Sequence, residues 1–181
     1  IVQPGAPGEL PRELSAEEAI EVADTRHTAS DARFMRDMIP HHQQALEMSR
    51  LAPDRTNSPK LLEIAGKIEA AQGDEIAFME QWLTSRGESI DRSHPHAGHH
   101  TMKGMATEAQ MAALAAATGV EFDRQFLSLM IAHHEGAIDM VEALMEQPGS
   151  AYDPTLFDFT TDVTNDQSKE TEVIPDNLQA L

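Results

Sequence analysis

Apolar residues recur along most of the chain at spacings of three, four and seven positions, with charged and polar residues between them. This period is typical of amphipathic helices that bury one face. The sequence lacks runs of β-branched residues bounded by turn residues, which would predict strands. The pattern therefore predicts an all-α protein, with long helices over about residues 30–52, 58–87, 121–147 and 153–181.

Residues at the predicted boundaries support these helices. Ser58–Pro59 and Asp153–Pro154 each combine a capping residue with proline at the first helical position, where a missing amide costs nothing. The capping-box patterns Ser15–Glu18 and Thr107–Gln110 predict a short helix ahead of each long pair. Two tandem hairpins with short loops pack antiparallel and bury their apolar faces together, which predicts a four-helix bundle.

The two halves of the chain form an internal repeat. A shift of 92 positions places Phe34 on Phe126 and His41–His42 on His133–His134, and beyond residue 52 the shift becomes 95. We therefore expect a flexible N-terminal segment followed by one bundle domain over residues 15–181. The boundaries are 1–14 for the segment, 15–90 for the first repeat, 91–106 for a His- and Met-rich linker and 107–181 for the second repeat.

Net charge limits the classes of partner. The chain has 31 acidic and 13 basic residues, which gives a formal net charge of −18. This charge repels phosphate backbones and anionic lipids, so we expect no nucleic-acid binding and no membrane-surface binding by the domain itself. The same charge attracts cations, but a diffuse field does not select a particular metal.

The chain contains no cysteine, whereas it has nine histidines and ten methionines. A thiol-free sequence suits an oxidising compartment. The first residue is Ile1 rather than methionine, and the Pro- and Gly-rich stretch Gln3–Gly8 follows it, as in a mature chain whose signal peptide has been removed. We therefore expect an extracytoplasmic location, either secreted or tethered to the cell surface.

A Met-x-x-His-His motif lies on the first long helix of each copy. Helical spacing places Met38, His41 and Met48 on one face, and adjacent histidines diverge by about 100°. Thioether sulfur is a soft ligand and imidazole nitrogen a borderline one, a combination that suits Cu(I) better than Mg, Ca or Mn. The predicted metal ligands are Met38, His41, His42, Met48, Met130, His133, His134 and Met140.

Two other interpretations of this motif stay open. Methionine at helical spacing is ordinarily core filler, and a buried histidine is more often a hydrogen-bonded structural residue. The chain would then be a helical protein-interaction module without metal. Alternatively, histidine with Asp or Glu would form a zinc or mixed divalent site.

The linker between the copies carries six more candidate ligands. Short His-rich tracts bind metal through their composition, flexibly and with modest selectivity. We expect this one to serve capture or transfer of the ion; the alternative is an ordinary polar linker. The candidates are His94, His96, His99, His100, Met102 and Met105.

Enzyme signatures are not met. His134–Glu135 begins like a zinc-protease motif, but Ile138 stands where the second histidine is required. Ferritin-like di-iron sites need Glu-x-x-His pairs, and no Glu of this chain is followed by His three positions later. Without cysteine there is no thiol nucleophile. We expect no enzymatic activity.

Three segments, Phe34–His42, Ala71–Met79 and Phe126–Ala137, carry a resemblance to a known family. Over about residues 28–181 the chain resembles the domain of unknown function 305 family. Members are ferritin-like helical proteins of bacteria that are commonly exported, and some are tied to copper binding and resistance. The resemblance implies a ferritin-like four-helix bundle that binds copper.

The family pattern also implies two ligand sets, with Gln72, Glu75, Gln167 and Glu170 as hydrogen-bond partners either of the ligands or between helices. The second copy departs from the pattern, because Ile174 replaces the expected methionine and Thr171 the expected isoleucine. Pro175 is expected to interrupt the last helix and weaken that site. The first set is Met38, His41, His42, Met48 and Met79, and the second is Met130, His133, His134 and Met140.

These observations lead to one predicted function: extracytoplasmic binding, sequestration or transfer of copper. Cu(I) is the favoured ion, and zinc is the alternative metal. The expected partners are the metal ion and a copper-handling protein.

Overall fold

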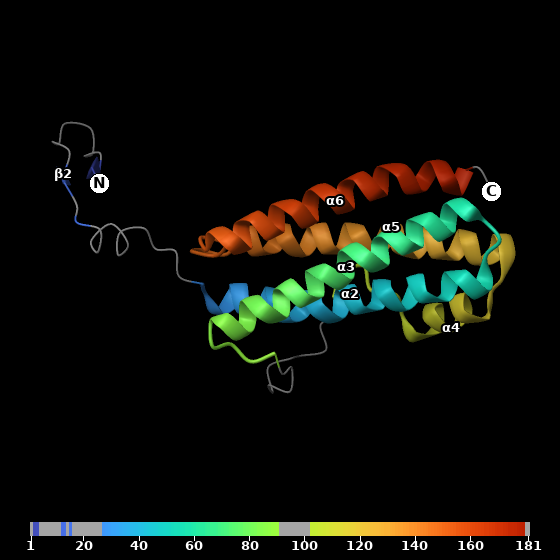
Figure 1. Cartoon of the computed structure of the whole chain (residues 1–181), viewed down its shortest axis with the longest axis horizontal. Helices are drawn as coiled ribbons and strands as arrows, with labels where there is room; N and C mark the ends of the chain where they lie inside the picture. The colour runs from blue at the N-terminus through green and yellow to red at the C-terminus, as the bar shows by residue number, and fades with distance from the viewer. Residues whose placement is uncertain (1, 4–11, 14, 16–26, 91–101, 180–181) are drawn as a thin grey trace.

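Helices make up the main body of the protein (Figure 1). The structure, a computed structural model, describes residues 2–3, 12–13, 15, 27–90 and 102–179. Two two-residue strands near the N-terminus, β1 (Val2–Gln3) and β2 (Arg12–Glu13), pair antiparallel outside the helical body. The helices are α2 (Ala29–Arg55), α3 (Pro59–Ser85), α4 (Glu108–Ala116), α5 (Gly119–Met145) and α6 (Pro154–Gln179).

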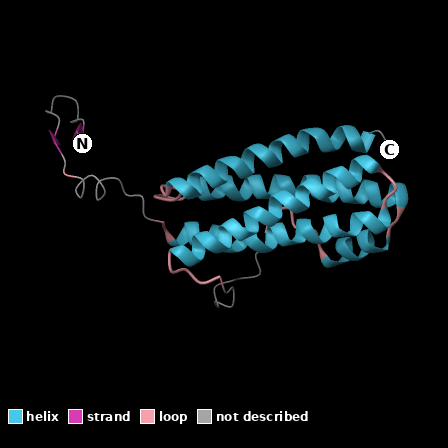
Figure 2. Ribbon diagram, viewed as in Figure 1, coloured by secondary structure: helices cyan, strands magenta, loops and turns pink. Residues whose placement is uncertain are grey.

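The four long helices form two antiparallel hairpins that lie side by side (Figure 2). Helix α2 packs along α3, and α5 packs along α6. The two hairpins meet chiefly where α2 contacts α5, while the short helix α4 packs against α5 and α2 at one end. The predicted all-α bundle is confirmed.

Helix starts follow the capping residues that the sequence predicts. The Ser58 side chain caps α3 by accepting a hydrogen bond from the Leu61 amide at 3.2 Å. Thr107 and Gln110 form the predicted capping box of α4. The short helix predicted after Ser15 falls outside the described residues.

The expectation that Pro175 interrupts the last helix is wrong, because α6 runs through this position to Gln179. Helix α2 likewise includes Pro40 and Pro53 within its length. Proline removes one backbone donor, but neighbouring turns packed in a bundle keep the helix continuous.

The core divides into two apolar clusters along the bundle axis. The first, the Met79 cluster, contains residues of the N-terminal half of α2 and the C-terminal half of α5, with Trp82 and Phe159. The second, the Phe126 cluster, contains residues of the C-terminal half of α2 and the N-terminal half of α5, with Phe122 and Ile174. Between them lies the histidine layer, which consists of His41, His42, His133 and His134, each with 0% exposure.

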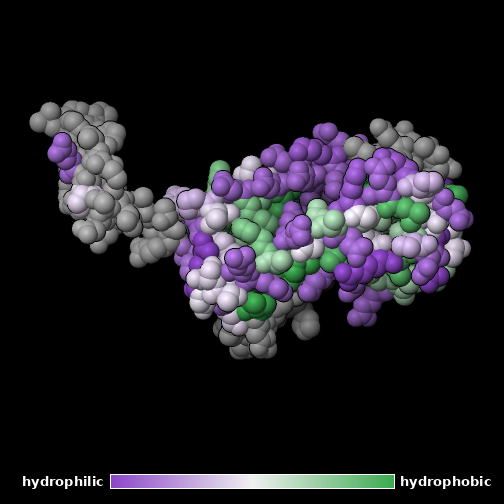
Figure 3. All heavy atoms as spheres, viewed as in Figure 1, coloured by the Kyte–Doolittle hydropathy of each residue, from purple (hydrophilic) through white to green (hydrophobic). Residues whose placement is uncertain are grey.

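On the face that Figure 3 shows, hydrophilic residues cover much of the helical body, and hydrophobic residues gather in patches among them. The large exposed apolar side chains include Val120, Tyr152 and Phe157. Within the described part of the chain, no helix is both long enough and apolar enough to span a bilayer.

Candidate metal centre

The histidine layer forms where α2 and α5 cross. Adjacent residues on a helix diverge by about 100°, so one histidine of each pair faces the other hairpin while its neighbour faces its own hairpin partner. The His41 and His133 rings accordingly stack on each other, with centroids 3.8 Å apart and planes inclined by 35°. His42 and His134 turn instead towards α3 and α6.

The two outward-turned histidines each meet a carboxylate. His42 donates from Nε2 to Glu75 Oε2 at 2.7 Å, and His134 donates from Nε2 to Glu170 Oε2. Both glutamates are only partly exposed. A carboxylate held against one ring nitrogen fixes the tautomer and the orientation of the imidazole, as it does for histidine ligands of metals.

The two stacked histidines meet backbone carbonyls. His41 donates from Nε2 to the Lys103 carbonyl at 3.0 Å, and His133 donates from Nε2 to the His41 carbonyl at 2.7 Å. A carbonyl oxygen only accepts, so the hydrogen must lie on Nε2 in both rings. Lys103 and Glu75 thus play the same part for two different rings.

All four histidines therefore present the same atom. With the hydrogen on Nε2, Nδ1 of the neutral ring carries a lone pair. Nδ1 is buried and has no hydrogen-bond partner in any of the four rings. A buried unsatisfied polar atom costs about 1–3 kcal/mol, and four in one layer are unusual for a native core.

Burial keeps the stacked rings neutral. Desolvation and the neighbouring His42 lower the pKa of His41 from 6.5 to about 4, an effect that the bond to Lys103 partly offsets. Burial and His41 hold the pKa of His133 well below its ordinary value. Both rings can thus offer a nitrogen lone pair at neutral pH, which metal binding requires.

The predicted methionine ligands lie in the two clusters beside the layer. Met38 and Met79 are fully buried in the Met79 cluster, and the partly buried Met140 packs against this cluster. Met48 and Met130 are fully buried in the Phe126 cluster. Each cluster thus mixes methionines of the two copies, because α2 and α5 run antiparallel.

The second cluster has one thioether fewer. Ile174 is 1% exposed and occupies in the Phe126 cluster the position that corresponds to Met79 in the first copy.

Among the described residues, no three His, Asp or Glu side chains are grouped so that they could hold a metal by themselves.

Two buried amides accompany the carboxylates. Gln72 lies one turn before Glu75 on α3, and Gln167 lies one turn before Glu170 on α6. Both side chains are nearly inaccessible, and neither the nitrogen nor the oxygen of either amide has a partner. The sequence predicts them as hydrogen-bond partners of the ligands or between helices, but their side chains make neither kind of bond in this structure.

The C-terminal end of the linker, residues 102–106, contacts the histidine layer. Met102 and Met105 are half-buried and flank Lys103, whose carbonyl binds His41. His94, His96, His99 and His100 fall outside the described residues. The sequence does not predict the part played by Lys103, because a residue of any type supplies a backbone carbonyl.

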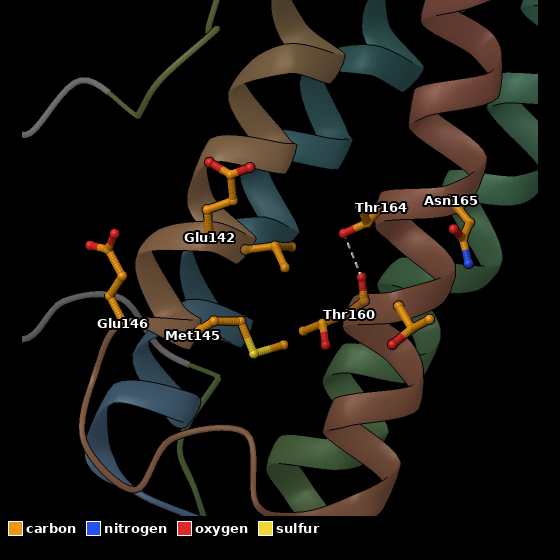
Figure 4. Close-up of a pocket in the computed structure, with 8 residues that line it drawn as sticks. Glu142, Met145, Glu146, Thr160, Thr164 and Asn165 are labelled. Carbon is orange, nitrogen blue, oxygen red and sulfur yellow. Dashed lines mark hydrogen bonds between the residues drawn. The ribbon is translucent and has the colours of Figure 1, made fainter.

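A surface groove lies away from the histidine layer. It has a volume of about 460 Å³ between α5 and α6, and none of the predicted ligands lines it. Figure 4 shows Met145 pointing across the groove towards Thr160, with Glu142 and Glu146 on the rim. The hydroxyl of Thr164 is already engaged, since it donates to the Thr160 carbonyl at 2.8 Å. The candidate centre is thus an interior layer rather than an open pocket.

Fold and site together define a class of protein: a four-helix bundle in which two His-His pairs meet between two methionine-containing cores. The chain belongs to the DUF305 family, described as a domain of unknown function, which matches residues 31–178.

Solved structures of similar proteins share the fold. A DUF305 fragment from Deinococcus radiodurans is 28% identical, with a TM-score of 0.75, over 86% of this chain and 99% of that one. A DUF305 protein from Streptomyces coelicolor, described as a candidate secreted protein, is 30% identical, with a TM-score of 0.72, over 83% and 93%. CopM in its Cu(I)-bound form is 27% identical, with a TM-score of 0.65, over 83% and 96%.

Structures of CopM in Cu(II)-bound and Ag-bound forms are similar to this chain as well. Among curated proteins, the uncharacterised protein L153 of Acanthamoeba polyphaga mimivirus is 34% identical over 62 residues. These residues are 34% of this chain, and the match spans about two fifths (41%) of the viral protein's length.

Proposed function

We propose that this protein binds copper, with Cu(I) favoured, through imidazole Nδ1 atoms of the histidine layer and thioether sulfurs beside it. One observation carries the proposal: four buried Nδ1 atoms in one layer have no hydrogen-bond partner, while every Nε2 has one. Cations held by these nitrogens together with thioether sulfurs would satisfy the lone pairs that the protein leaves unpaired.

The donor chemistry supports copper. Neutral imidazole and thioether ligands suit a soft monovalent ion, because they add no negative charge and no hard oxygen. The similar protein CopM has been seen with Cu(I), Cu(II) and silver, and silver is a soft ion of the same charge as Cu(I). Binding and release of Cu(I) by these ligands need no change in the oxidation state of copper.

We assign the methionine donors by cluster rather than by copy. Met38, Met79 and Met140 would serve one group of donors, and Met48 and Met130 the other, since the antiparallel crossing of α2 and α5 brings them into shared clusters. Ile174 leaves the second group with fewer sulfurs. The group that contains Met79 is therefore the stronger Cu(I) site.

The physiological part of the proposal is extracytoplasmic sequestration or transfer of the ion. It is supported by the absence of cysteine from the whole sequence and by the description of the Streptomyces coelicolor relative. In this scheme the His- and Met-rich linker, including Met102 and Met105, captures the ion and exchanges it with a copper-handling protein.

Titration of metal-free protein with Cu(I), in competition with a chelator of known affinity, tests the proposal. Wild type should bind Cu(I), and its melting temperature should rise with copper concentration. Changing all four histidines of the layer to Leu should abolish this affinity, while His27→Gln, outside the layer, should keep it. Circular dichroism checks that each variant is folded.

Three results count against the proposal. Wild-type Cu(I) affinity in the four-histidine variant refutes the histidine layer as the site. Tighter binding of Zn(II) than of Cu(I), with no effect of Met38→Leu, supports the zinc alternative. If neither metal shifts the melting temperature, the result supports the alternative of a helical protein-interaction module without metal.

A further inference from the structure

The described end of the linker, the turn Met102–Ala106, packs on the bundle directly over the histidine layer. Its Lys103 carbonyl accepts the Nε2 hydrogen of His41 at 3.0 Å. His41 itself is completely buried, so this carbonyl closes the layer on one side. We name this segment the linker turn.

Two glycines allow the linker turn to approach so closely. A Cβ atom on Gly136 of α5 would lie 2.2 Å from the Lys103 carbonyl oxygen and 2.6 Å from the Gly104 Cα. A Cβ atom on Gly104 would lie 2.3 Å from the Ala132 carbonyl oxygen, and its φ of +76° also favours glycine. Real Cβ atoms do not come this close to backbone, so any side chain here would push the turn away from α5.

Hydrogen bonds from a side chain of α2 hold the linker turn on the bundle. The Gln44 side chain donates to the Ala106 carbonyl at 2.9 Å and accepts from the Ala106 amide at 2.7 Å. An exposed ion pair, Lys103 Nζ to Asp139 Oδ2 at 3.0 Å, adds little, because such pairs are largely screened by solvent. The turn is thus fixed by backbone packing on one helix and an amide pair on the other.

The linker turn makes the two stacked histidines different. His133 uses as its acceptor the carbonyl of His41, which belongs to the rigid body of α2. His41 uses a carbonyl of the connecting segment instead. Only the His41 tautomer therefore depends on whether the linker is docked.

We propose that the linker turn is the positioning element of the metal centre: by docking through Gly104, Gly136 and Gln44, it holds His41 in the Nε2–H form and leaves Nδ1 for the ion. This inference rests on the proposed function. It assigns to a backbone carbonyl the part that Glu75 and Glu170 play for the other pair of rings. It also couples the buried layer to the linker, since undocking the turn frees the His41 ring to change tautomer and orientation.

Gly136→Ala is the variant that tests the proposal. Alanine favours the helix over glycine, so α5 should fold, while the new methyl group displaces the linker turn. Gly66→Ala is the matched control, because a Cβ on this helical glycine meets no atom within 4 Å. The first readout is the ring ¹⁵N spectrum of metal-free protein, and the second is Cu(I) affinity by chelator competition.

We expect wild type and Gly66→Ala to show His41 in a single Nε2–H form, and Gly136→Ala to show exchange between two tautomers. Cu(I) affinity of Gly136→Ala should fall 10–100-fold, the usual effect of losing a partner of a ligating histidine. Gln44→Leu, which removes both bonds to Ala106, should act in the same direction. A single Nε2–H form and wild-type Cu(I) affinity in both Gly136→Ala and Gln44→Leu would overturn the inference.

The tautomer readout needs no metal, so the two failures are distinguishable. Absence of Cu(I) binding by wild type refutes the proposed function. Unchanged tautomer and affinity in both Gly136→Ala and Gln44→Leu, with wild type binding Cu(I) normally, refutes the linker turn as a positioning element and leaves the proposed function intact.

Discussion

Each histidine of the layer donates its Nε2 hydrogen to a different acceptor. Glu75 and Glu170 supply carboxylates, while Lys103 and His41 supply backbone carbonyls. The result is the same in each ring, because the acceptor decides which nitrogen keeps the lone pair. Orientation of the donor atoms is thus set before any ion arrives.

Glu75→Gln tests this dependence at one ring. The amide keeps the size of the side chain but removes its charge, and its oxygen is a weaker acceptor for the His42 hydrogen. We expect Cu(I) affinity to fall about 10–100-fold. Glu69→Gln, an exposed position on the same helix α3 that pairs with Arg50, is the control and should leave affinity unchanged. Equal affinities of the two variants would show that the carboxylate does not orient the ring.

The pH dependence of stability follows from the low pKa of the stacked rings. Above pH 6.5 His41 is neutral in both the folded and the unfolded chain. Between pH 6.5 and about 4 the unfolded chain takes up a proton that the folded chain does not, so the free energy of unfolding falls as pH falls. His133 acts in the same direction.

Urea denaturation of metal-free protein at pH 7 and pH 4.5 measures this effect. One such histidine should cost about 2 kcal/mol of stability over the interval, at about 1.4 kcal/mol per pH unit. His133→Leu should show a smaller loss between the two pH values than wild type, since it retains one of the two rings. An equal loss in both proteins would contradict the assignment to these rings.

At the level of single residues, the sequence predicts the buried histidines and methionines because helical spacing puts them on apolar faces. It does not predict which ring nitrogen is free, since the acceptors Lys103 and Glu75 come from other elements. Gly104 and Gly136 likewise carry no local signal, because their close approach joins segments that are distant in the sequence.

Helix α2 begins at a complete capping box. Thr28 and Asp31 form a capping box, in which the Asp31 carboxylate accepts from the Thr28 amide at 2.7 Å. The same buried carboxylate accepts from the Ala151 amide at 2.8 Å and so ties the loop between α5 and α6 to α2. One side chain therefore joins the ends of both hairpins.

Asp31→Ala should be strongly destabilising. It removes the half of the capping box in which Asp31 accepts from the Thr28 amide, which is worth about 1 kcal/mol, and leaves the buried Ala151 amide unpaired at a cost of about 1–3 kcal/mol. We expect the free energy of unfolding to fall by about 2–4 kcal/mol in urea denaturation. Asp166→Ala, which removes an exposed ion pair with Lys169, should change it by less than about 0.5 kcal/mol. Similar losses in the two variants would refute the role of Asp31.

Helix positions could be read from the sequence where capping chemistry is local. Ser58, Thr107 and Asp153 act within one turn, so the starts of α3, α4 and α6 agree with prediction. The interruption expected at Pro175 fails for the opposite reason. Local propensity disfavours helix there, but the buried Ile174 holds the preceding turn in the Phe126 cluster, and α6 continues to Gln179.

For the whole molecule, the hairpin pattern predicts the bundle, but not how its methionines are shared. The predicted ligand sets follow the two copies, whereas the clusters combine Met38 and Met79 with Met140, and Met48 with Met130. This pairing depends on the antiparallel crossing of α2 and α5. That crossing is a property of the assembled bundle, not of either copy.

The net charge of −18 should make stability depend on salt. Raising NaCl from about 0.01 M to 0.5 M shortens the screening length from about 30 Å to below 10 Å, which weakens repulsion between carboxylates. We expect the melting temperature to rise by a few degrees. The double variant Asp158→Asn, Asp162→Asn, on the exposed face of α6, should melt higher than wild type at low salt and respond less to NaCl. A melting temperature that falls with NaCl would contradict this account.

The contact between the stacked histidines has a consequence for the architecture. In a symmetric homodimer of single-copy chains, each inward histidine would donate to its counterpart's backbone, so that two reciprocal bonds would close the interface. Here only one of these bonds exists, from His133 to the His41 carbonyl, and the covalent connection between the copies supplies the second acceptor. The two inward histidines are therefore not equivalent: the acceptor of His133 lies on α2, whereas the acceptor of His41 lies on the peptide that connects the two hairpins.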